Sequence, residues 1–149
     1  MNIDRALIRD IGILIGRIGI GVILFAHGWQ KVFDWGLPMT AEIMGGAGVP
    51  LPTLSAYFTG FAELIGGAAL IVGVAVPLAA ASGIFIMTGA FIYAQNSSTI
   101  FMDDNGFGFV LSIAVACTML VAAGSGRFGL DHYLPWRFIK EESQVKQLV

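Results

Sequence analysis

IGRIGIGVILFAHGWQKVF, residues 15–33, is apolar over a length that suits a membrane-spanning helix, yet it contains Arg17 and, near its end, His27. About 20 apolar residues cross the hydrocarbon core of a bilayer. A charge at the centre costs roughly 2.5–3.5 kcal/mol on insertion scales, so ionisable groups usually face the bundle interior and have partners there. The stretch therefore predicts a membrane helix with a polar face turned toward other helices.

The composition of the whole chain agrees with a membrane location. Of the 149 residues, 56% are hydrophobic and 12% are charged, whereas a soluble domain carries about 25% charged residues. A chain of this length is expected to form one domain, residues 1–149, that lies mostly in the membrane. The net charge of −2 without a Lys/Arg cluster argues against nucleic acid as a partner.

Four apolar segments are long enough, or nearly so, to cross a bilayer. They are residues 11–31, 54–76, 78–95 and 107–123. Pro77 suits the first turn of the third helix, after a tight linker. The longer first loop favours a short helix near residues 39–44, followed by the irregular run GGAGVPLP. We therefore predict an all-α fold, a four-transmembrane-helix bundle with a short extracytoplasmic helix in the first loop and a cytoplasmic tail over residues 124–149.

The distribution of basic residues predicts the orientation, because cytoplasmic flanks are enriched in Lys and Arg. Six of the eight lie near the termini, namely Arg5, Arg9, Arg127, Arg137, Lys140 and Lys146. Lys31 lies on the other side of the first span, and Arg17 lies within it. The opposite loops hold acidic residues, including Asp103 and Asp104. Four spans place both termini on one face, which we expect to be the cytoplasmic one.

Three ionisable residues, Arg17, His27 and Glu63, lie within the apolar segments. With a rise of about 1.5 Å per residue, Glu63 falls between Arg17 and His27 in depth. An ion pair of Glu63 with Arg17 is feasible on this estimate, and so is a contact with His27. We expect Arg17 to be tolerated because Glu63 neutralises it where two helices touch.

Helical periodicity supports an inward position for these groups. One stripe of the first helix contains Arg17, Gly21, Leu24, Gly28 and Lys31, with His27 at its border. The second helix carries Ala56, Gly60, Glu63 and Gly67 on a common face. Small residues let membrane helices approach closely, so we expect these two faces to meet.

A purely structural interpretation stands beside the functional one. A buried arginine–carboxylate pair can fix the register of two helices without any chemistry. His27 can be a hydrogen-bonded residue of the outer interface, and Lys31 is expected to extend toward the headgroups. Arg127 and Asp131, spaced i, i+4, are expected to form a local pair that caps the fourth helix.

Several cofactor classes lack their sequence signatures. A bis-histidine haem needs two facing histidines, whereas the second histidine, His132, lies in the predicted tail. No H-E-x-x-H or C-x-x-C motif indicates a metal centre, and no G-x-G-x-x-G or P-loop indicates a nucleotide. The single cysteine, Cys117, cannot form a disulfide within the chain.

Four motifs in order, R-x-x-x-G (Arg17 and Gly21), HGWQK (27–31), FAELIGGAALIVG (61–73) and GSGRFGLD (124–131), resemble the DoxX family of small bacterial membrane proteins. The resemblance implies a four-helix bundle of the bacterial cell membrane with both termini inside. The residues that match the family pattern are Arg17, Gly21, His27, Gly28, Lys31, Glu63, Gly67, Gly126, Arg127 and Asp131. The chain departs from the pattern at Gly108, near a position where a glutamate often opens the fourth helix, which disfavours a mechanism with two membrane carboxylates.

The resemblance also implies a connection with redox metabolism, through the quinone pool or thiol chemistry. Our first hypothesis is a membrane subunit that binds a quinone near Arg17, His27 and Glu63, with Tyr57 among the aromatic walls. No other cofactor is expected, and no catalytic residue is assigned.

Two further hypotheses remain open. The chain can be a non-enzymatic membrane anchor or assembly partner of a soluble or respiratory oxidoreductase, since it lacks the signature of a redox centre of its own. Alternatively, it can transport protons or a small solute. Four helices give little room for a path unless a homo-oligomer forms, for which the glycine face of Gly12, Gly16 and Gly19 is a candidate contact.

Overall fold

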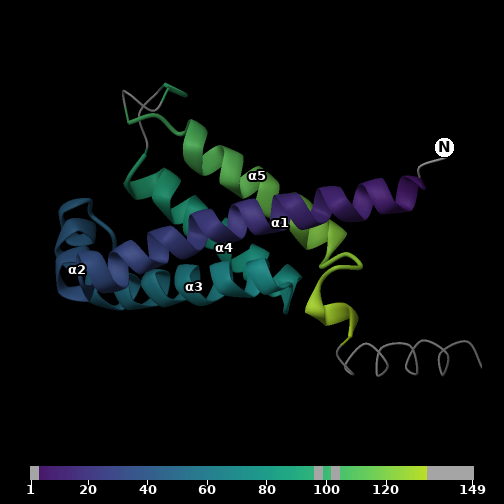
Figure 1. Cartoon of the computed structure of the whole chain (residues 1–149). Coiled ribbons are helices and arrows are strands. Elements are labelled where there is room, and N and C mark those ends of the chain that lie inside the picture. The colour runs from purple at the N-terminus through teal and green to yellow at the C-terminus, as the bar shows by residue number, and fades with distance from the viewer. Residues whose placement is uncertain (1–3, 96–98, 102–104, 134–149) are drawn as a thin grey trace, which may run out of the picture.

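The computed structural model describes residues 4–95, 99–101 and 105–133, and these residues form helices without a strand. In chain order the elements are α1 (Arg5–Trp29), the π-helical turn η1 (Gln30–Asp34), α2 (Leu37–Gly46), α3 (Pro52–Val72), α4 (Val76–Tyr93), α5 (Gly108–Ala123) and the 3₁₀ turn η3 (Leu130–His132) (Figure 1). The predicted all-α fold is confirmed for this part of the chain. Asp103, Asp104 and the tail beyond residue 133 lie outside the described residues.

Three of the helices are long and apolar enough to cross a membrane. They are Arg5–Asp34, which joins α1 to η1, and the helices α3 and α4. The fourth predicted span, α5, is apolar but has 16 residues, which corresponds to a rise of about 24 Å. The described helices therefore include three clear candidates for membrane spans and a shorter fourth one.

The helix ends follow local capping chemistry that shifts them from the predicted positions. The side chain of Asp4 accepts a hydrogen bond from the Ala6 amide over 3.1 Å, so α1 begins well before residue 11. Gly73 ends α3 with a left-handed φ of 84°, which closes the helix before the predicted residue 76. Pro77 lies in the first turn of α4, as predicted.

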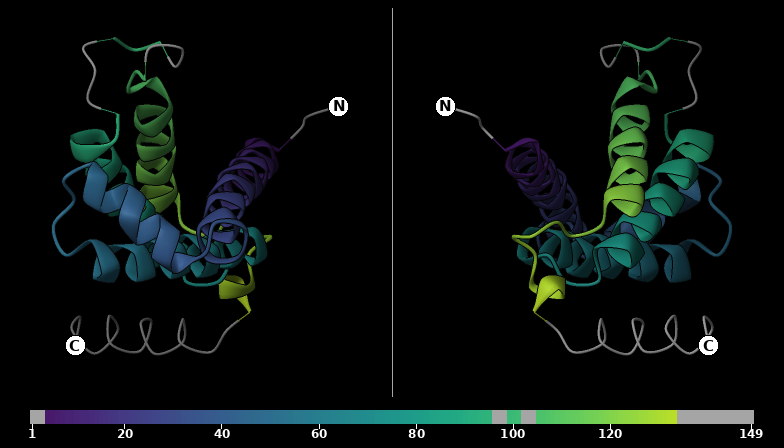
Figure 2. Two further views of the ribbon diagram at one scale, coloured as in Figure 1. Left: turned by 90° about the vertical axis from the view of Figure 1, so that its left-hand side faces the viewer. Right: turned by 90° about the vertical axis from the view of Figure 1, so that its right-hand side faces the viewer.

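The four long helices, taken in chain order, run in alternating directions along the bundle (Figure 1). The N-terminal end of α1 lies with the α3–α4 turn and the end of α5, whereas α2 lies at the opposite end. α1 packs most extensively along α3, and α4 packs along α5. α1 and α5 diverge in the end-on views of Figure 2. The two described chain ends therefore lie at the same end of the bundle, which is the arrangement that four spans require.

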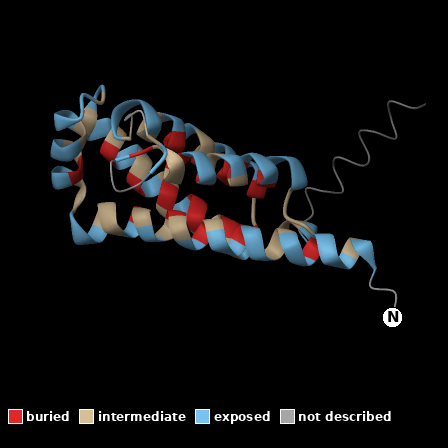
Figure 3. Ribbon diagram, turned by 90° about the horizontal axis from the view of Figure 1, so that it is seen from above, coloured by how far each residue is buried: buried red, intermediate tan, exposed pale blue. Residues whose placement is uncertain are grey.

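The interior contains small and aliphatic side chains. Buried residues of α1 form the predicted stripe, Arg17, Gly21, Leu24 and Gly28, which continues to Asp10. Figure 3 shows this stripe on the side of α1 that faces the other helices. Ala56, Gly60, Glu63 and Gly67 are buried on α3. The prediction that these two faces meet is confirmed.

α2 is the short helix predicted in the first loop, although it begins and ends slightly outside residues 39–44. The Thr40 hydroxyl donates to the carbonyl oxygens of Lys31 and Gly36, each over 3.0 Å. This buried threonine ties α2 back to the end of the first helix. The position of α2 relative to a membrane stays a prediction.

Candidate functional site

Arg17 is buried, with 1% of its surface exposed, but it does not contact Glu63. Its Nη1 donates to the carbonyl oxygens of Leu70 and Ile71 over 3.0 and 3.3 Å, and its Nη2 donates to the Phe128 carbonyl over 3.3 Å. The last carbonyls of a helix lack partners within it and carry partial negative charge. Arg17 therefore joins α1 to the C-terminal end of α3 and to the segment that follows α5.

Asp131 completes this junction from the far side of the α3–α4 turn. Its carboxylate accepts hydrogen bonds from the backbone amides of Ala75 and Val76, over 2.8 and 3.2 Å. Its own amide donates to the Gly73 carbonyl over 2.9 Å, and it interacts electrostatically with Arg17. Asp131 thus caps the N-terminus of α4 from a distant part of the sequence. We call Arg17, Gly73 and Asp131 the turn clamp.

Gly73 is required in the turn clamp for two reasons. Its positive φ is a conformation that glycine adopts without steric cost. A β-carbon there would overlap the guanidinium of Arg17 and would lie 2.6 Å from the Cα of Gly129. The close approach of three chain segments therefore depends on the absence of a side chain at this position.

Glu63 pairs with Lys31 instead of Arg17. The Lys31 ammonium donates to Glu63 Oε2 across 2.5 Å, and the two side chains are 17% and 2% exposed. The predicted pairing of Glu63 with Arg17 or His27 is therefore wrong, as is the expectation that Lys31 extends to the headgroups.

The register of α1 against α3 explains the error. A β-carbon on Gly28 would meet the backbone of Leu64 and Glu63, whereas one on Gly21 would meet Gly67 and Ile71. Glu63 therefore lies opposite Gly28, roughly 16 Å from Arg17 along the axis. The sequence estimate placed residue 11 level with the end of the second helix, whereas α3 ends at Val72, level with Arg17.

The contacts of His27 and Tyr57 involve neither Arg17 nor Glu63. His27 is half-buried; its Nδ1 is 2.8 Å from the Ile23 carbonyl oxygen, and its ring centroid is 5.5 Å from that of Phe109 on α5. Tyr57 is exposed on α3 and lines an apolar groove of about 610 Å³ between α3 and α4, together with Phe58 and Phe61. The structure does not bring the four proposed quinone ligands together.

The motif glycines have a packing role. A β-carbon on Gly67 would lie 2.7 Å from the Gly21 carbonyl oxygen and 2.8 Å from the Phe25 Cα, and one on Gly28 would overlap the Leu64 backbone. Side chains at these positions would force α1 and α3 apart. The short distance between these helices is what lets Lys31 reach Glu63.

Arg127 and Asp131 do not form the predicted local pair. Arg127 is exposed, and its Nε lies 4.0 Å from Oδ2 of Asp10 on α1. Asp10, with 1% of its surface exposed, is a residue that the sequence interpretation missed. Its position seven residues before Arg17, on the same face of the helix, was the available signal.

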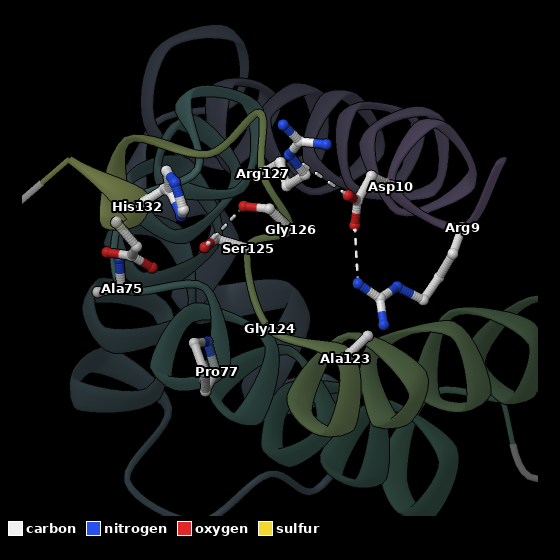
Figure 4. Close-up of a pocket in the computed structure, with 11 residues that line it drawn as sticks. Arg9, Asp10, Ala75, Pro77, Ala123, Gly124, Ser125, Gly126, Arg127 and His132 are labelled. Atoms are coloured by element: carbon white, nitrogen blue, oxygen red, sulfur yellow. Dashed lines mark hydrogen bonds and ion pairs between the residues drawn. The ribbon is translucent and has the colours of Figure 1, made fainter. Parts of the chain in front are cut away.

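A pocket of about 650 Å³ lies at this end of the bundle (Figure 4). Arg9 and Asp10 line it from α1, Pro77 from α4, and Arg127 and His132 from the segment after α5. Among the described residues, no group of three or more His, Cys, Asp or Glu side chains is placed to hold a metal ion.

Comparison with known proteins gives two matches. The family model DoxX matches residues 12–96. Over 125 residues, which make up 84% of this chain and 88% of the relative, the chain is 30% identical to the "Putative oxidoreductase CatD" of Bacillus subtilis (strain 168). No solved structure matches the chain significantly.

Proposed function

The chain belongs to the DoxX family, and from this premise we propose that it is a multi-pass membrane subunit linked to redox metabolism, which serves as the membrane anchor or assembly partner of an oxidoreductase. The redox link is supported by the name of the relative, a "Putative oxidoreductase". The anchoring role is supported by one observation: the buried charges Arg17 and Glu63 are both used in bonds between the chain's own helices. Bonds of this kind stabilise the fold of the chain, which suits a protein that serves to hold a partner at the membrane.

Deletion and affinity purification test the anchoring role. The full chain, purified in mild detergent after cross-linking in its native membranes, is expected to carry an oxidoreductase in a fixed ratio. Deleting the chain should release that enzyme from the membrane fraction, and restoring the wild-type chain should return it. An enzyme that stays on the membrane after deletion would contradict the anchoring role.

A quinone site at Lys31 and Glu63 is the second candidate, favoured by their position at an α1–α3 contact inside an apolar segment. The donor set fits the headgroup: the ammonium can donate to a quinone carbonyl, and the carboxylate can accept from a quinol hydroxyl. Arg17 lies roughly 16 Å from this pair along the axis, and Tyr57 lines a groove between α3 and α4 that neither Lys31 nor Glu63 lines, so the site differs from the one predicted from the sequence. A bound quinone would supply the electron chemistry, while Lys31 and Glu63 would orient its headgroup.

Extraction of quinone from purified protein tests this second candidate. Wild-type protein is expected to retain quinone, whereas Glu63→Gln should lose most of it while still folding. Tyr57→Phe is the matched control, because it removes one hydroxyl from the same helix at a position that faces the α3–α4 groove. Equal quinone content in all three proteins would rule out a site at Glu63.

The orientation with both termini in the cytoplasm and a location in the bacterial cell membrane are parts of the same proposal. The common position of the described chain ends at one end of the bundle supports it (Figure 1). Arg5, Arg9 and Arg127 lie at that end, and basic residues on the cytoplasmic flanks support the proposed direction.

A further inference from the structure

The pocket between the start of α1, the start of α4 and the segment after α5 has features that neither the turn clamp nor the Lys31–Glu63 pair uses. Its volume of about 650 Å³ lies within the range of roughly 300–1,000 Å³ that is usual for small-molecule sites. Figure 4 shows Arg9 and Arg127 on either side of Asp10, each joined to its carboxylate by a dashed line.

Two cations share one carboxylate in this pocket. Arg9 Nη2 donates to Asp10 Oδ1 over 3.3 Å, and Arg127 Nε lies 4.0 Å from Oδ2. Oδ2 is buried and accepts no hydrogen bond. The arginine side chains are 70% and 65% exposed, and each guanidinium has several N–H donors. One positive charge and most of these donors therefore remain available.

The other charged groups near the pocket do not cancel this excess. The Asp131 carboxylate also lines the pocket, but it is bonded to the amides of Ala75 and Val76 and interacts with Arg17. His132 lies on the same wall and adds no negative charge. With Arg17 beside Asp131, the three arginines exceed the two carboxylates by one charge. An anion that enters the pocket would meet the exposed donors of Arg9 and Arg127.

The level of the pocket relative to a bilayer identifies the class of anion. Asp10 directly precedes the apolar run that starts at Ile11, Ala123 is the last residue of α5, and Pro77 lies in the first turn of α4. In the membrane orientation proposed above, these helix ends fall at the level where lipid headgroups begin. Basic pockets between membrane helices on the cytoplasmic side bind anionic headgroups.

We propose that this pocket binds the phosphate of an anionic phospholipid headgroup, with Arg9 and Arg127 as its donors. A guanidinium can bind phosphate through two parallel hydrogen bonds, which makes arginine well suited to the task. Asp10 is a positioning residue, because its buried carboxylate holds the two guanidiniums on either side of the entrance. This inference rests on the proposed membrane orientation, but it does not depend on the redox role.

Native mass spectrometry of the detergent-purified full chain tests the proposal with phosphatidylglycerol, phosphatidylcholine and inorganic phosphate as separate probes. Wild-type protein should bind one phosphatidylglycerol in preference to phosphatidylcholine. The double variant R9Q/R127Q should lose about 30-fold in affinity for phosphatidylglycerol, since each arginine contributes about one kcal/mol to anionic lipid binding. Arg5→Gln, which removes an exposed arginine from the same helix, should bind like wild type.

Three outcomes would overturn the proposal. They are equal binding of the two lipids, binding of inorganic phosphate as tight as that of phosphatidylglycerol, and lipid binding unchanged in R9Q/R127Q. If the double variant instead lost a co-purifying protein while lipid binding stayed the same, the pocket would be a protein interface. If R9Q/R127Q does not fold, the variant R9K/R127K tests the same site. It keeps both positive charges but lacks the paired N–H donors, and it should bind phosphatidylglycerol with intermediate affinity.

Discussion

Glu63 accepts a hydrogen bond from Lys31 across 2.5 Å, and this ion pair joins α1 to α3 at the level of Gly28. The two partners differ in exposure, since Lys31 is 17% exposed and Glu63 only 2%. An unpaired lysine here can bend its long side chain toward the surface, whereas an unpaired Glu63 stays buried. The pair should therefore respond unequally to the loss of either member.

Lys31→Met should destabilise the protein more than Glu63→Gln. Loss of one partner from a buried ion pair costs roughly 3–5 kcal/mol, and Lys31→Met leaves a buried carboxylate. Glu63→Gln should cost about 1–3 kcal/mol, because its amide can still accept a hydrogen bond. The double variant K31M/E63L should recover most of the loss, since no buried charge remains. Unfolding free energies in detergent measure all three, and equal costs for the single variants would contradict the asymmetry.

Arg17→Leu should weaken the turn clamp. The carbonyl oxygens of Leu70, Ile71 and Phe128 would lose their donor, and a hydrogen bond from a charged donor contributes roughly 1.5–3 kcal/mol. Arg17→Lys should be intermediate, because a compact ammonium cannot span all three acceptors. The denaturation midpoint measures the effect, with Arg5→Gln as the exposed control. A variant Arg17→Leu as stable as this control would show that the clamp contributes little.

Gly67→Ala should separate α1 from α3. Its new methyl group would meet the backbone of Gly21 and Phe25, and overpacking of this kind typically costs about 1–3 kcal/mol. Gly89→Ala on α4 is the matched control, because nothing lies within 4 Å of its β-position. That change should be neutral or stabilise the helix by up to about 1 kcal/mol. Similar unfolding free energies for the two variants would argue against the close α1–α3 contact.

The sequence predicted helix faces better than it predicted which residues meet. Periodicity identified the buried stripe of Arg17, Gly21 and Gly28, because a face depends only on spacing within one helix. The partner of Glu63 depends on how far α1 slides along α3. The register of α1 against α3 is set by glycines that each fit against a particular stretch of backbone. It cannot be predicted from the spacing of residues within one helix.

Contacts that join distant segments escaped prediction for a related reason. Asp131 lies four residues after Arg127, and the spacing predicted a pair between the two. Asp131 instead caps α4, which begins more than fifty residues earlier. The α3–α4 turn leaves the amides of Ala75 and Val76 without partners, and only the folded chain shows which carboxylate reaches them. Asp10 was overlooked because it stands at the edge of the apolar run.

Asp131→Ala should destabilise the start of α4. A capping carboxylate contributes about 0.5–2 kcal/mol, and Asp131 also interacts with Arg17. Its effect should therefore be less than additive with that of Arg17→Leu, as expected for residues of one network. Glu42→Gln, on exposed α2, is the control for loss of an acidic charge. Strictly additive unfolding free energies would indicate that Arg17 and Asp131 act independently.

The proposed orientation can be measured by cysteine labelling, because the natural Cys117 is 0% exposed and is the single cysteine of the chain. Glu42→Cys places a thiol on α2, and Tyr133→Cys places one at the opposite end of the bundle, both at exposed positions. In intact cells a membrane-impermeant maleimide should label Glu42→Cys, and it should label Tyr133→Cys only after permeabilisation. The reverse pattern would place the termini outside, and labelling of the wild-type chain would contradict the burial of Cys117.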